Sequence, residues 1–230
     1  MPVLVVFGSP VSPFVRKVEA VLRHSGQAYD FESINIMDMP DWFLEISPLR
    51  RIPVLRDKSI GETGIAGTLA DSSAICLYLD RKYDAGLYGA TAFDAGQAAW
   101  LEEYADSDLA MTVGMKVFRP IMFPRFAGQA SDIETARKAW HEKLPRNFDY
   151  LERLLDGKDF FVNDTYSIAD IAIGCQLTQL DLVVGLPDRQ IWPGLAAHTE
   201  NMKARPGFTE NLAICGKMLG GLLPEKIDLS

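Results

Sequence analysis

The segment G-S-P-V-S-P-F-V, residues 8–15, places two hydroxyl side chains, Ser9 and Ser12, where an apolar run gives way to a helical pattern. The first N–H groups of a helix have no intrahelical partners and carry partial positive charge. The simplest interpretation is structural, with Ser12 as the N-cap and Pro13 as the first helical residue. The chemical interpretation is that a hydroxyl donor beside this helix end stabilises an anion. These residues alone leave both interpretations open.

A second hydroxyl stands at a similar junction in D-S-S-A-I, residues 71–75. Asp71 and Ser72 form a good N-cap pair, and the same helix end is also suited to bind an anion. Between the two junctions, R-R-I-P-V-L has Pro53 at the start of an expected strand, where a proline is unremarkable. Arg51 is either a solvated surface residue or a ligand for a carboxylate.

Strand and helix patterns alternate in the first third of the chain. A short apolar run at 4–7 predicts a buried strand, and residues 14–25 predict a helix with Val15, Val18 and Leu22 on one face. The remaining elements expected in this part are strands at 28–34, 52–55 and 68–70 and a helix at 72–83. Between Leu55 and Asp71 the chain is expected to form an extended hairpin loop.

From residue 93 onward the patterns are helical. Helices are expected at 93–118, with a break near Pro120, and at 131–155, 166–182, 194–204 and 208–219. Ser167 and Asp170 have the S-x-x-acid spacing of a capping box, with Tyr166 and Ile171 placed as a hydrophobic staple. We therefore expect an α/β domain over 1–84, a linker over 85–92 and an all-α domain over 93–230.

Composition excludes several classes of function. The formal net charge of −8 argues against a nucleic-acid footprint, which needs clustered Lys and Arg. No apolar run approaches the 18 residues of a membrane span, and the first residues lack a basic leader, so we expect a cytoplasmic protein. Three distant cysteines favour buried apolar roles over disulfides, and the three histidines are not spaced as metal ligands, so no metal site is expected.

The order of these motifs along essentially the whole chain resembles the glutathione transferase family, in its cytosolic, serine-containing and bacterial-like form. The resemblance rests on a strand followed by S-P-F-V-R-K-V, then R-I-P-V-L, then D-S-S-A-I, and on the capping box in the second half. It implies a thioredoxin-like first domain followed by an all-α domain. Thioredoxin relatives carry C-P-Y-C where this chain has S-P-F-V, and a serine cannot form the mixed disulfide of dithiol exchange.

The resemblance implies a role for each motif in binding glutathione as cosubstrate. Ser12, with Ser9 as its rival, would hold the glutathione sulfur as a thiolate. Pro53 would follow a cis peptide bond, and Val54 would pair its N–H and C=O with the cysteinyl unit. The remaining implied contacts are Arg51 with the glycyl carboxylate, Ser72 with the γ-glutamyl carboxylate, and Asp71, shorter than the family's usual Glu, with the ammonium.

The resemblance also implies an enzyme that attacks a small electrophilic substrate, with Tyr104 and Met111 in the wall of the electrophile pocket. Both residues belong to an aromatic and methionine stripe at helical spacing, and a stripe of this kind usually forms a helix core. A homodimer with a role in detoxification is implied. The alternatives are a glutathione-dependent isomerase, dehalogenase or etherase of the same family, and a non-catalytic binding or interaction protein with the same fold.

Overall fold

The computed structural model describes residues 2–229, which divide into two compact units. The first ends at Gly86 and also includes Pro206–Asn211, and the second contains Leu87–Arg205 and the chain from Leu212 onward. The division falls within the expected linker at 85–92. From the sequence we expected residues 206–211 to belong to the all-α domain, but in the structure they belong to the first unit. The side-chain amide of Asn211 donates hydrogen bonds to the Pro10 carbonyl at 3.0 Å and to Glu19 at 2.7 Å.

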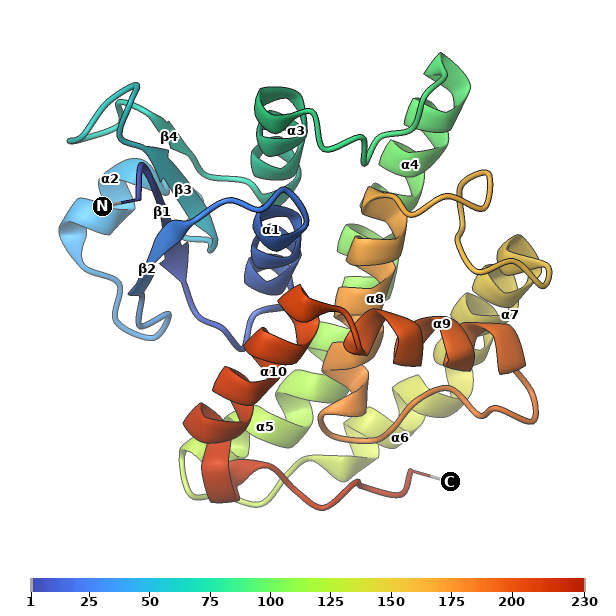
Figure 1. The fold of residues 1–230 in the computed structure, drawn as a ribbon. Coiled ribbons are helices and arrows are strands. Elements are labelled where there is room, and N and C mark those ends of the chain that lie inside the picture. The colour runs from blue at the N-terminus through green and yellow to red at the C-terminus, as the bar shows by residue number, and fades with distance from the viewer. Residues whose placement is uncertain (1, 230) are drawn as a thin grey trace. The chain divides into compact units, whose positions relative to one another are not determined.

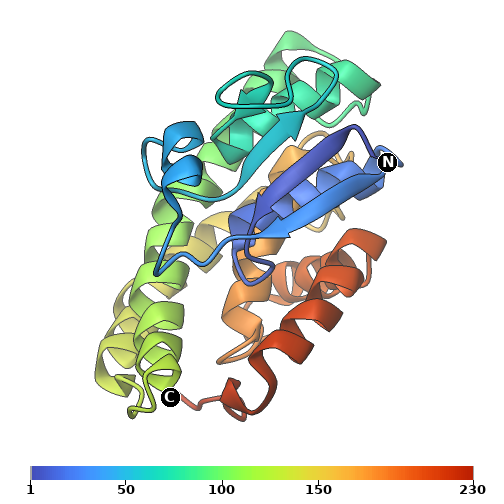
Figure 2. The same cartoon turned by 90° about the vertical axis from the view of Figure 1, so that its left-hand side faces the viewer.

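A four-stranded mixed sheet forms the centre of the first unit. Its strands are β1 (Leu4–Gly8), β2 (Tyr29–Ser33), β3 (Val54–Asp57) and β4 (Thr68–Leu69). The spatial order is β2-β1-β3-β4, with β1 parallel to β2 and the other two pairs antiparallel. Figures 1 and 2 both show β1 next to β2, and α1 (Pro13–His24) connects these two strands.

Helices cover both faces of this sheet. Helix α3 (Ser72–Tyr83) packs beside α1 on one face, and α2 (Asp41–Ile46) covers the other (Figure 1). Because side chains alternate along a strand, β1 supplies both cores. Val5 and Phe7 form a cluster with Phe43 and Ile46 of α2. The α/β arrangement expected for this part of the chain is confirmed.

Two local predictions for the first unit need correction. Helix α2 was not predicted, because its six residues are too few to show helical periodicity. Strand β3 spans Val54–Asp57, whereas we expected a strand over 52–55. Pro53 has no N–H to donate to a strand ladder, so the strand begins after it. Helix α3 spans 72–83 as predicted.

The second unit is helical, as predicted. Its first helical segments follow one another directly: α4 (Ala92–Tyr104), the π-helices η1 (Ala105–Leu109) and η2 (Met111–Phe118), and α5 (Arg119–Phe126). They are followed by α6 (Ile133–Glu142), α7 (Leu144–Leu155), α8 (Ile168–Asp181), α9 (Pro193–Lys203), α10 (Pro206–Leu219), which begins in the first unit, and the 3₁₀-helix η3 (Gly220–Leu222). Helix α8 is buried along most of its length and contacts α4, η1, η2 and α9, so it is the central helix of this unit.

Prolines account for two corrections in the second unit. The break expected near Pro120 does not occur, because Pro120 occupies the start of α5, where a missing N–H is tolerated. The helix expected over 131–155 is instead two helices, α6 and α7. Pro145 stands in the first turn of α7 and cannot continue the hydrogen bonding of α6.

The predicted capping box is present at the start of α8. Ser167 donates from its N–H to Asp170 Oδ2 at 2.8 Å and from its hydroxyl at 2.9 Å. The fully buried Asp170 carboxylate also accepts from the Phe161 N–H and from His198 Nε2, each at 3.1 Å. This one carboxylate therefore joins the start of the central helix to α9 and to the preceding loop.

Candidate functional site

One edge of the sheet brings together the candidate residues of the first unit. Strands β1 and β4 both run antiparallel to β3, so their carboxyl ends meet the amino end of β3 at the same edge. Ser9 and Ser12 follow β1, Pro53 precedes β3, and Asp71 and Ser72 follow β4. Residues from three distant segments are thus gathered by the strand order alone.

Ser12 caps α1 and keeps its hydroxyl hydrogen available. Its side-chain oxygen accepts from the Val15 N–H at 3.4 Å, and its own N–H donates to the Ser9 carbonyl at 2.9 Å, closing a turn. A capping hydroxyl accepts a hydrogen bond through a lone pair of its oxygen, so its hydrogen remains available to donate to another acceptor. Within residues 2–229, the Ser12 hydroxyl has no acceptor. The half-buried Ser12 therefore combines a confirmed structural cap with an open donor at a helix N-terminus.

Ser9 remains a rival on these contacts. It is half-buried in the same turn, and across residues 2–229 its hydroxyl also has no partner. Gly8 brings this turn close to α1, because a Cβ added at Gly8 would lie 2.6 Å from Cγ2 of Val15. Because Gly8 has no side chain, the end of β1 can lie close to the start of α1.

The sheet ladder occupies the backbone groups of Val54. The register between β1 and β3 is continuous from Phe7–Val54 to the flanking pair Val3–Lys58, where the Lys58 N–H bonds the Val3 carbonyl at 2.9 Å. Hydrogen-bonded pairs alternate in an antiparallel ladder, which makes Phe7–Val54 a hydrogen-bonded pair as well. Both polar groups of Val54 thus face Phe7, which argues against the expected role of Val54 in pairing with a peptide.

The backbone N–H and C=O of Ile52, unlike those of Val54, lie outside the sheet ladder. The Ile52–Pro53 peptide bond is cis, as the resemblance implied. Ile52 lies just outside the ladder, and among residues 2–229 its N–H and C=O have no hydrogen-bond partner. The position immediately before Pro53 is the one sequence signal for this residue, and only the strand register distinguishes it from Val54.

Arg51 is exposed, with a free side chain on a fixed backbone. The buried Ser47 hydroxyl donates to the Arg51 carbonyl at 2.7 Å and accepts from the Arg51 N–H at 3.0 Å. The guanidinium has no partner among residues 2–229. It can therefore move to meet a carboxylate while its main chain stays in place.

At the start of α3 the predicted cap is confirmed and a further cation is added. Asp71 Oδ1 accepts from the Ala74 N–H at 3.0 Å, while Ser72, the first residue of the helix, is 7% exposed. Lys17 on α1 donates from Nζ to the Ser73 hydroxyl at 3.0 Å. This ammonium adds positive charge to a helix end that already favours anions. Sequence reasoning missed Lys17, because it is 56 residues from Ser73.

The two residues expected in the electrophile pocket lie in the second unit and differ in exposure. Tyr104, at the end of α4, is half-buried against the Tyr150 ring, with centroids 5.1 Å apart, and accepts from Asn147 Nδ2 at 2.6 Å. Burial raises the pKa of Tyr104 above its ordinary value, so the phenol stays protonated at neutral pH. Met111 on η2 is 53% exposed.

Burial tests the expectation for the cysteines. The three cysteines, Cys76, Cys175 and Cys215, are all buried, as predicted. In the described chain, residues 2–229, no three His, Cys, Asp or Glu side chains are grouped so that they could hold a metal ion. None of the helices described is long and apolar enough to cross a bilayer.

Both units match known family models. Residues 6–86 match the model described as "Glutathione S-transferase, N-terminal domain", and residues 134–201 match "Glutathione S-transferase, C-terminal domain". Together these ranges include the edge residues of the first unit and the capping box of the second.

Curated proteins and solved structures of glutathione S-transferases are also similar to this chain. Glutathione S-transferase theta-1 of Mus musculus is 30% identical over 175 residues, which cover 74% of this chain and 68% of the mouse protein. Glutathione S-transferase D6 of Drosophila melanogaster is 27% identical over 210 residues, or 88% of each chain. A crystal structure of a glutathione S-transferase from Rhodospirillum rubrum has a similar fold, with a TM-score of 0.80 over 91% of each chain at 24% identity.

Proposed function

Because the chain belongs to the glutathione S-transferase family, we propose that it transfers glutathione to a small electrophilic substrate, with Ser12 stabilising the glutathione thiolate. The observation that carries this proposal is the open Ser12 hydroxyl at the N-terminus of α1. Its oxygen caps the helix, and its hydrogen is left to donate to a ligand sulfur.

The expected effect of this hydroxyl follows from hydrogen-bond energies. A free thiol has a pKa of about 8.5, so only about 3% is ionised at neutral pH. A charge-assisted hydrogen bond contributes roughly 1.5–3 kcal/mol, and one pKa unit corresponds to about 1.36 kcal/mol. Donation from Ser12 therefore lowers the thiol pKa by about one to two units, and the helix end adds a smaller contribution of the same sign. The thiolate is the nucleophile that attacks the electrophilic carbon.

The peptide part of glutathione fits the charges along the same edge. The γ-glutamyl carboxylate binds at the N-terminus of α3, where Ser72 and the nearby Lys17 ammonium lie. Asp71 caps the helix through Oδ1, which leaves Oδ2 for the γ-glutamyl ammonium. Arg51 binds the glycyl carboxylate.

The cysteinyl unit pairs with main-chain groups at the start of β3. Ile52 supplies a backbone N–H and C=O that lie outside the ladder, whereas those of Val54 face Phe7. Pro53 follows Ile52 directly and precedes β3. The sulfur is then directed towards the turn that contains Ser9 and Ser12.

Met111 and Tyr104 of the second unit contact the electrophile in this proposal. An exposed methionine is flexible and polarisable, which suits electrophiles of varied shape. We include in the proposal a cytoplasmic homodimer with a role in detoxification. A broad substrate screen with glutathione present would separate transfer from isomerisation, dehalogenation and ether cleavage.

A titration of bound glutathione tests the role of Ser12. Thiolate absorbance in the ultraviolet is measured against pH for the wild type, Ser12→Ala and the matched variant Ser9→Ala. Ser12→Ala should raise the thiol pKa by about one to two units and lower the rate with an aryl halide roughly tenfold near neutral pH, while Ser9→Ala behaves as wild type.

The outcomes separate binding from activation. All three proteins should be retained on immobilised glutathione, since the contacts of the peptide part remain. An identical thiol titration in wild type and Ser12→Ala would reject the role of Ser12, and an effect confined to Ser9→Ala would transfer that role to Ser9. A wild-type protein that fails to bind glutathione would favour the non-catalytic alternative.

A further inference from the structure

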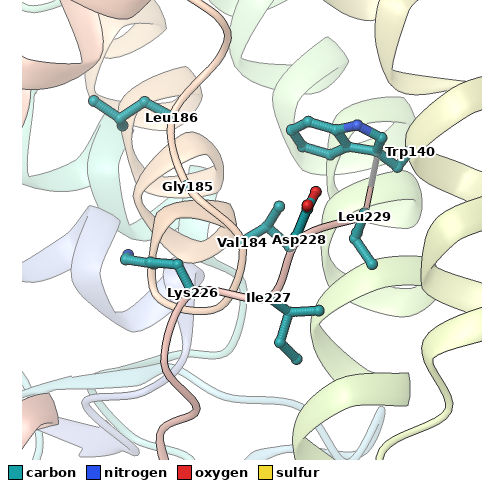
Figure 3. Close-up of a pocket in the computed structure, with 8 residues that line it drawn as sticks. All are labelled: Trp140, Val184, Gly185, Leu186, Lys226, Ile227, Asp228 and Leu229. Carbon is teal, nitrogen blue, oxygen red and sulfur yellow. The ribbon is translucent and has the colours of Figure 1, made fainter.

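A mostly buried cluster of polar side chains joins α1, β2 and the start of α10 within the first unit. Its members are Arg16, Glu19, Tyr29 and Asn211. No step of the proposed function uses them. The cluster is distinct from the pocket of about 330 Å³ in the second unit, whose lining is Trp140 and residues 184–186 and 226–229 (Figure 3). Polar groups cost free energy to bury unless they are paired, so the cluster's hydrogen bonds indicate what it positions.

Hydrogen bonds give the Asn211 side chain one orientation. Its Nδ2 donates to the Pro10 carbonyl at 3.0 Å and to Glu19 Oε2 at 2.7 Å, and its Oδ1 accepts from Arg16 Nε at 2.7 Å. An arginine N–H only donates and a carbonyl only accepts, so a reversed amide would lose the bonds to Arg16 and Pro10. One N–H of Asn211 is therefore directed at the Pro10 carbonyl.

The cluster also fixes Asn211 relative to the helix that Ser12 caps. Arg16 and Glu19 both lie on α1, and the Arg16 N–H donates to the Ser12 carbonyl at 3.0 Å. The Tyr29 hydroxyl donates to Glu19 Oε1 at 2.8 Å. Burial raises the pKa of Glu19 above its ordinary value, although the hydrogen bonds from Tyr29 and Asn211 act in the opposite direction. Asn211 is thus held by two side chains of α1 while it bonds the segment that leads into this helix.

The Pro10 carbonyl belongs to the central peptide unit of the turn before α1. Residues 9–12 form a β-turn, closed by the Ser12 N–H and the Ser9 carbonyl at 2.9 Å. The orientation of the central peptide sets the type of a β-turn, and with it the direction in which the fourth residue leaves the turn. Here the fourth residue is Ser12. The Asn211 amide therefore stabilises the direction of Ser12 from a position 201 residues after Pro10.

We propose that Asn211 is a positioning residue for the Ser12 hydroxyl, an inference that rests on the proposed role of Ser12. Asn211 does not contact glutathione. It holds the 9–12 turn so that the Ser12 hydroxyl hydrogen points to the sulfur. Hydrogen bonds weaken steeply as their angle departs from linear, so a small rotation of Ser12 is sufficient to lose part of the thiolate stabilisation.

Asn211→Leu is the test variant, because it is similar in size, adds no charge and removes the three hydrogen bonds of the amide. The thiol pKa of bound glutathione should rise by about one-half to one unit. With an aryl halide, kcat near neutral pH should fall about threefold to tenfold, while KM for glutathione changes about twofold or less. The difference in kcat should disappear well above pH 8.5, the approximate pKa of a free thiol, because glutathione then ionises without help.

Tyr29→Phe is the matched control. It removes a hydrogen bond from the same Glu19 carboxylate but does not touch Pro10. It should lower the melting temperature and leave the thiol titration and kcat as in the wild type. Thermal unfolding of each protein measures the structural cost, and Asn211→Ala replaces Asn211→Leu if the leucine prevents folding, since the polar cavity left by alanine can hold water.

The double variant with Ser12→Ala and Asn211→Leu separates this inference from the proposed function. If Asn211 acts through Ser12, Asn211→Leu should not raise the thiol pKa of Ser12→Ala any further. A wild-type titration in the folded Asn211 variant, an equal effect of Tyr29→Phe, or an additive effect in the double variant would each overturn the inference and leave the role of Ser12 intact. A wild-type titration in Ser12→Ala alone would reject the proposed function, and the inference with it.

Discussion

We expect Asp57→Asn to destabilise the first unit severely although Asp57 lies at the opposite edge of the sheet from Ser12. Asp57 ends β3 and is 1% exposed. Its Oδ1 accepts from the Ser59 N–H at 2.8 Å and from the Ser59 hydroxyl at 2.5 Å. Its Oδ2 accepts from the Tyr78 hydroxyl at 2.5 Å and from Lys82.

The magnitude follows from counting acceptors. An asparagine keeps one oxygen, so in either orientation two of the four donors face an NH₂ group instead of an acceptor. Breaking a buried ion pair costs about 3–5 kcal/mol. Because the Lys82 side chain is 29% exposed and can recover some hydration, we take the lower end, about 3 kcal/mol. For a chain of this length that corresponds to a melting temperature lowered by roughly 6–12 °C.

At acidic pH, the difference in unfolding free energy between the wild type and Asp57→Asn should decrease. Burial alone would raise the pKa of Asp57, but hydrogen bonds from Lys82, Ser59 and Tyr78 lower it far below its ordinary value. A lowered carboxyl pKa gives stability that is present above the unfolded value of about 3.9 and is lost as the pH falls towards the folded value. The gap between wild type and variant should therefore be constant near neutrality and shrink below about pH 4.

Thermal unfolding across this pH range is the assay, and Asp30→Asn is its control. Asp30 forms an exposed pair with Lys58 at 3.3 Å, which is worth at most about 1 kcal/mol. The reasoning is refuted if Asp57→Asn costs no more than Asp30→Asn, or if its cost grows on acidification. Retention on immobilised glutathione should survive in both folded variants.

Three further predictions concern Asp170, two glycines and the cysteines. Asp170→Asn should cost about 3–5 kcal/mol in unfolding free energy, because its buried carboxylate accepts four hydrogen bonds, and a melting temperature near that of wild type would contradict this. Gly67→Ala should destabilise more than Gly64→Ala: both have positive φ, but a Cβ at Gly67 would lie 2.5 Å from the Asp57 carbonyl oxygen whereas Gly64 is open, so equal urea midpoints would refute the clash. All three cysteines should react slowly with a thiol reagent in the native protein and rapidly in denaturant, and one fast native thiol would show that a site opens.

Local chemistry made much of this structure predictable from the sequence. Ser12 and Asp71 each bond an N–H three residues ahead, and Ser167 and Asp170 bond each other across the same interval. A cap depends only on neighbours within one turn, so residue type and spacing are sufficient to place it. The helix at 72–83, the buried cysteines and the change from mixed to helical structure follow from patterns of the same short range.

Tertiary structure decided the contacts between distant segments. The ladder register bonds Val54 to Phe7 and leaves Ile52 outside the ladder, Lys17 reaches Ser73, and Asn211 places the start of α10 in the first unit. No local pattern specifies such pairs, because a strand or helix face can meet many partners until strand order and side-chain packing select one. The sequence by itself thus determined which side chains stand at the ends of the strands. The fold determined which of their donors and acceptors remain available to a ligand.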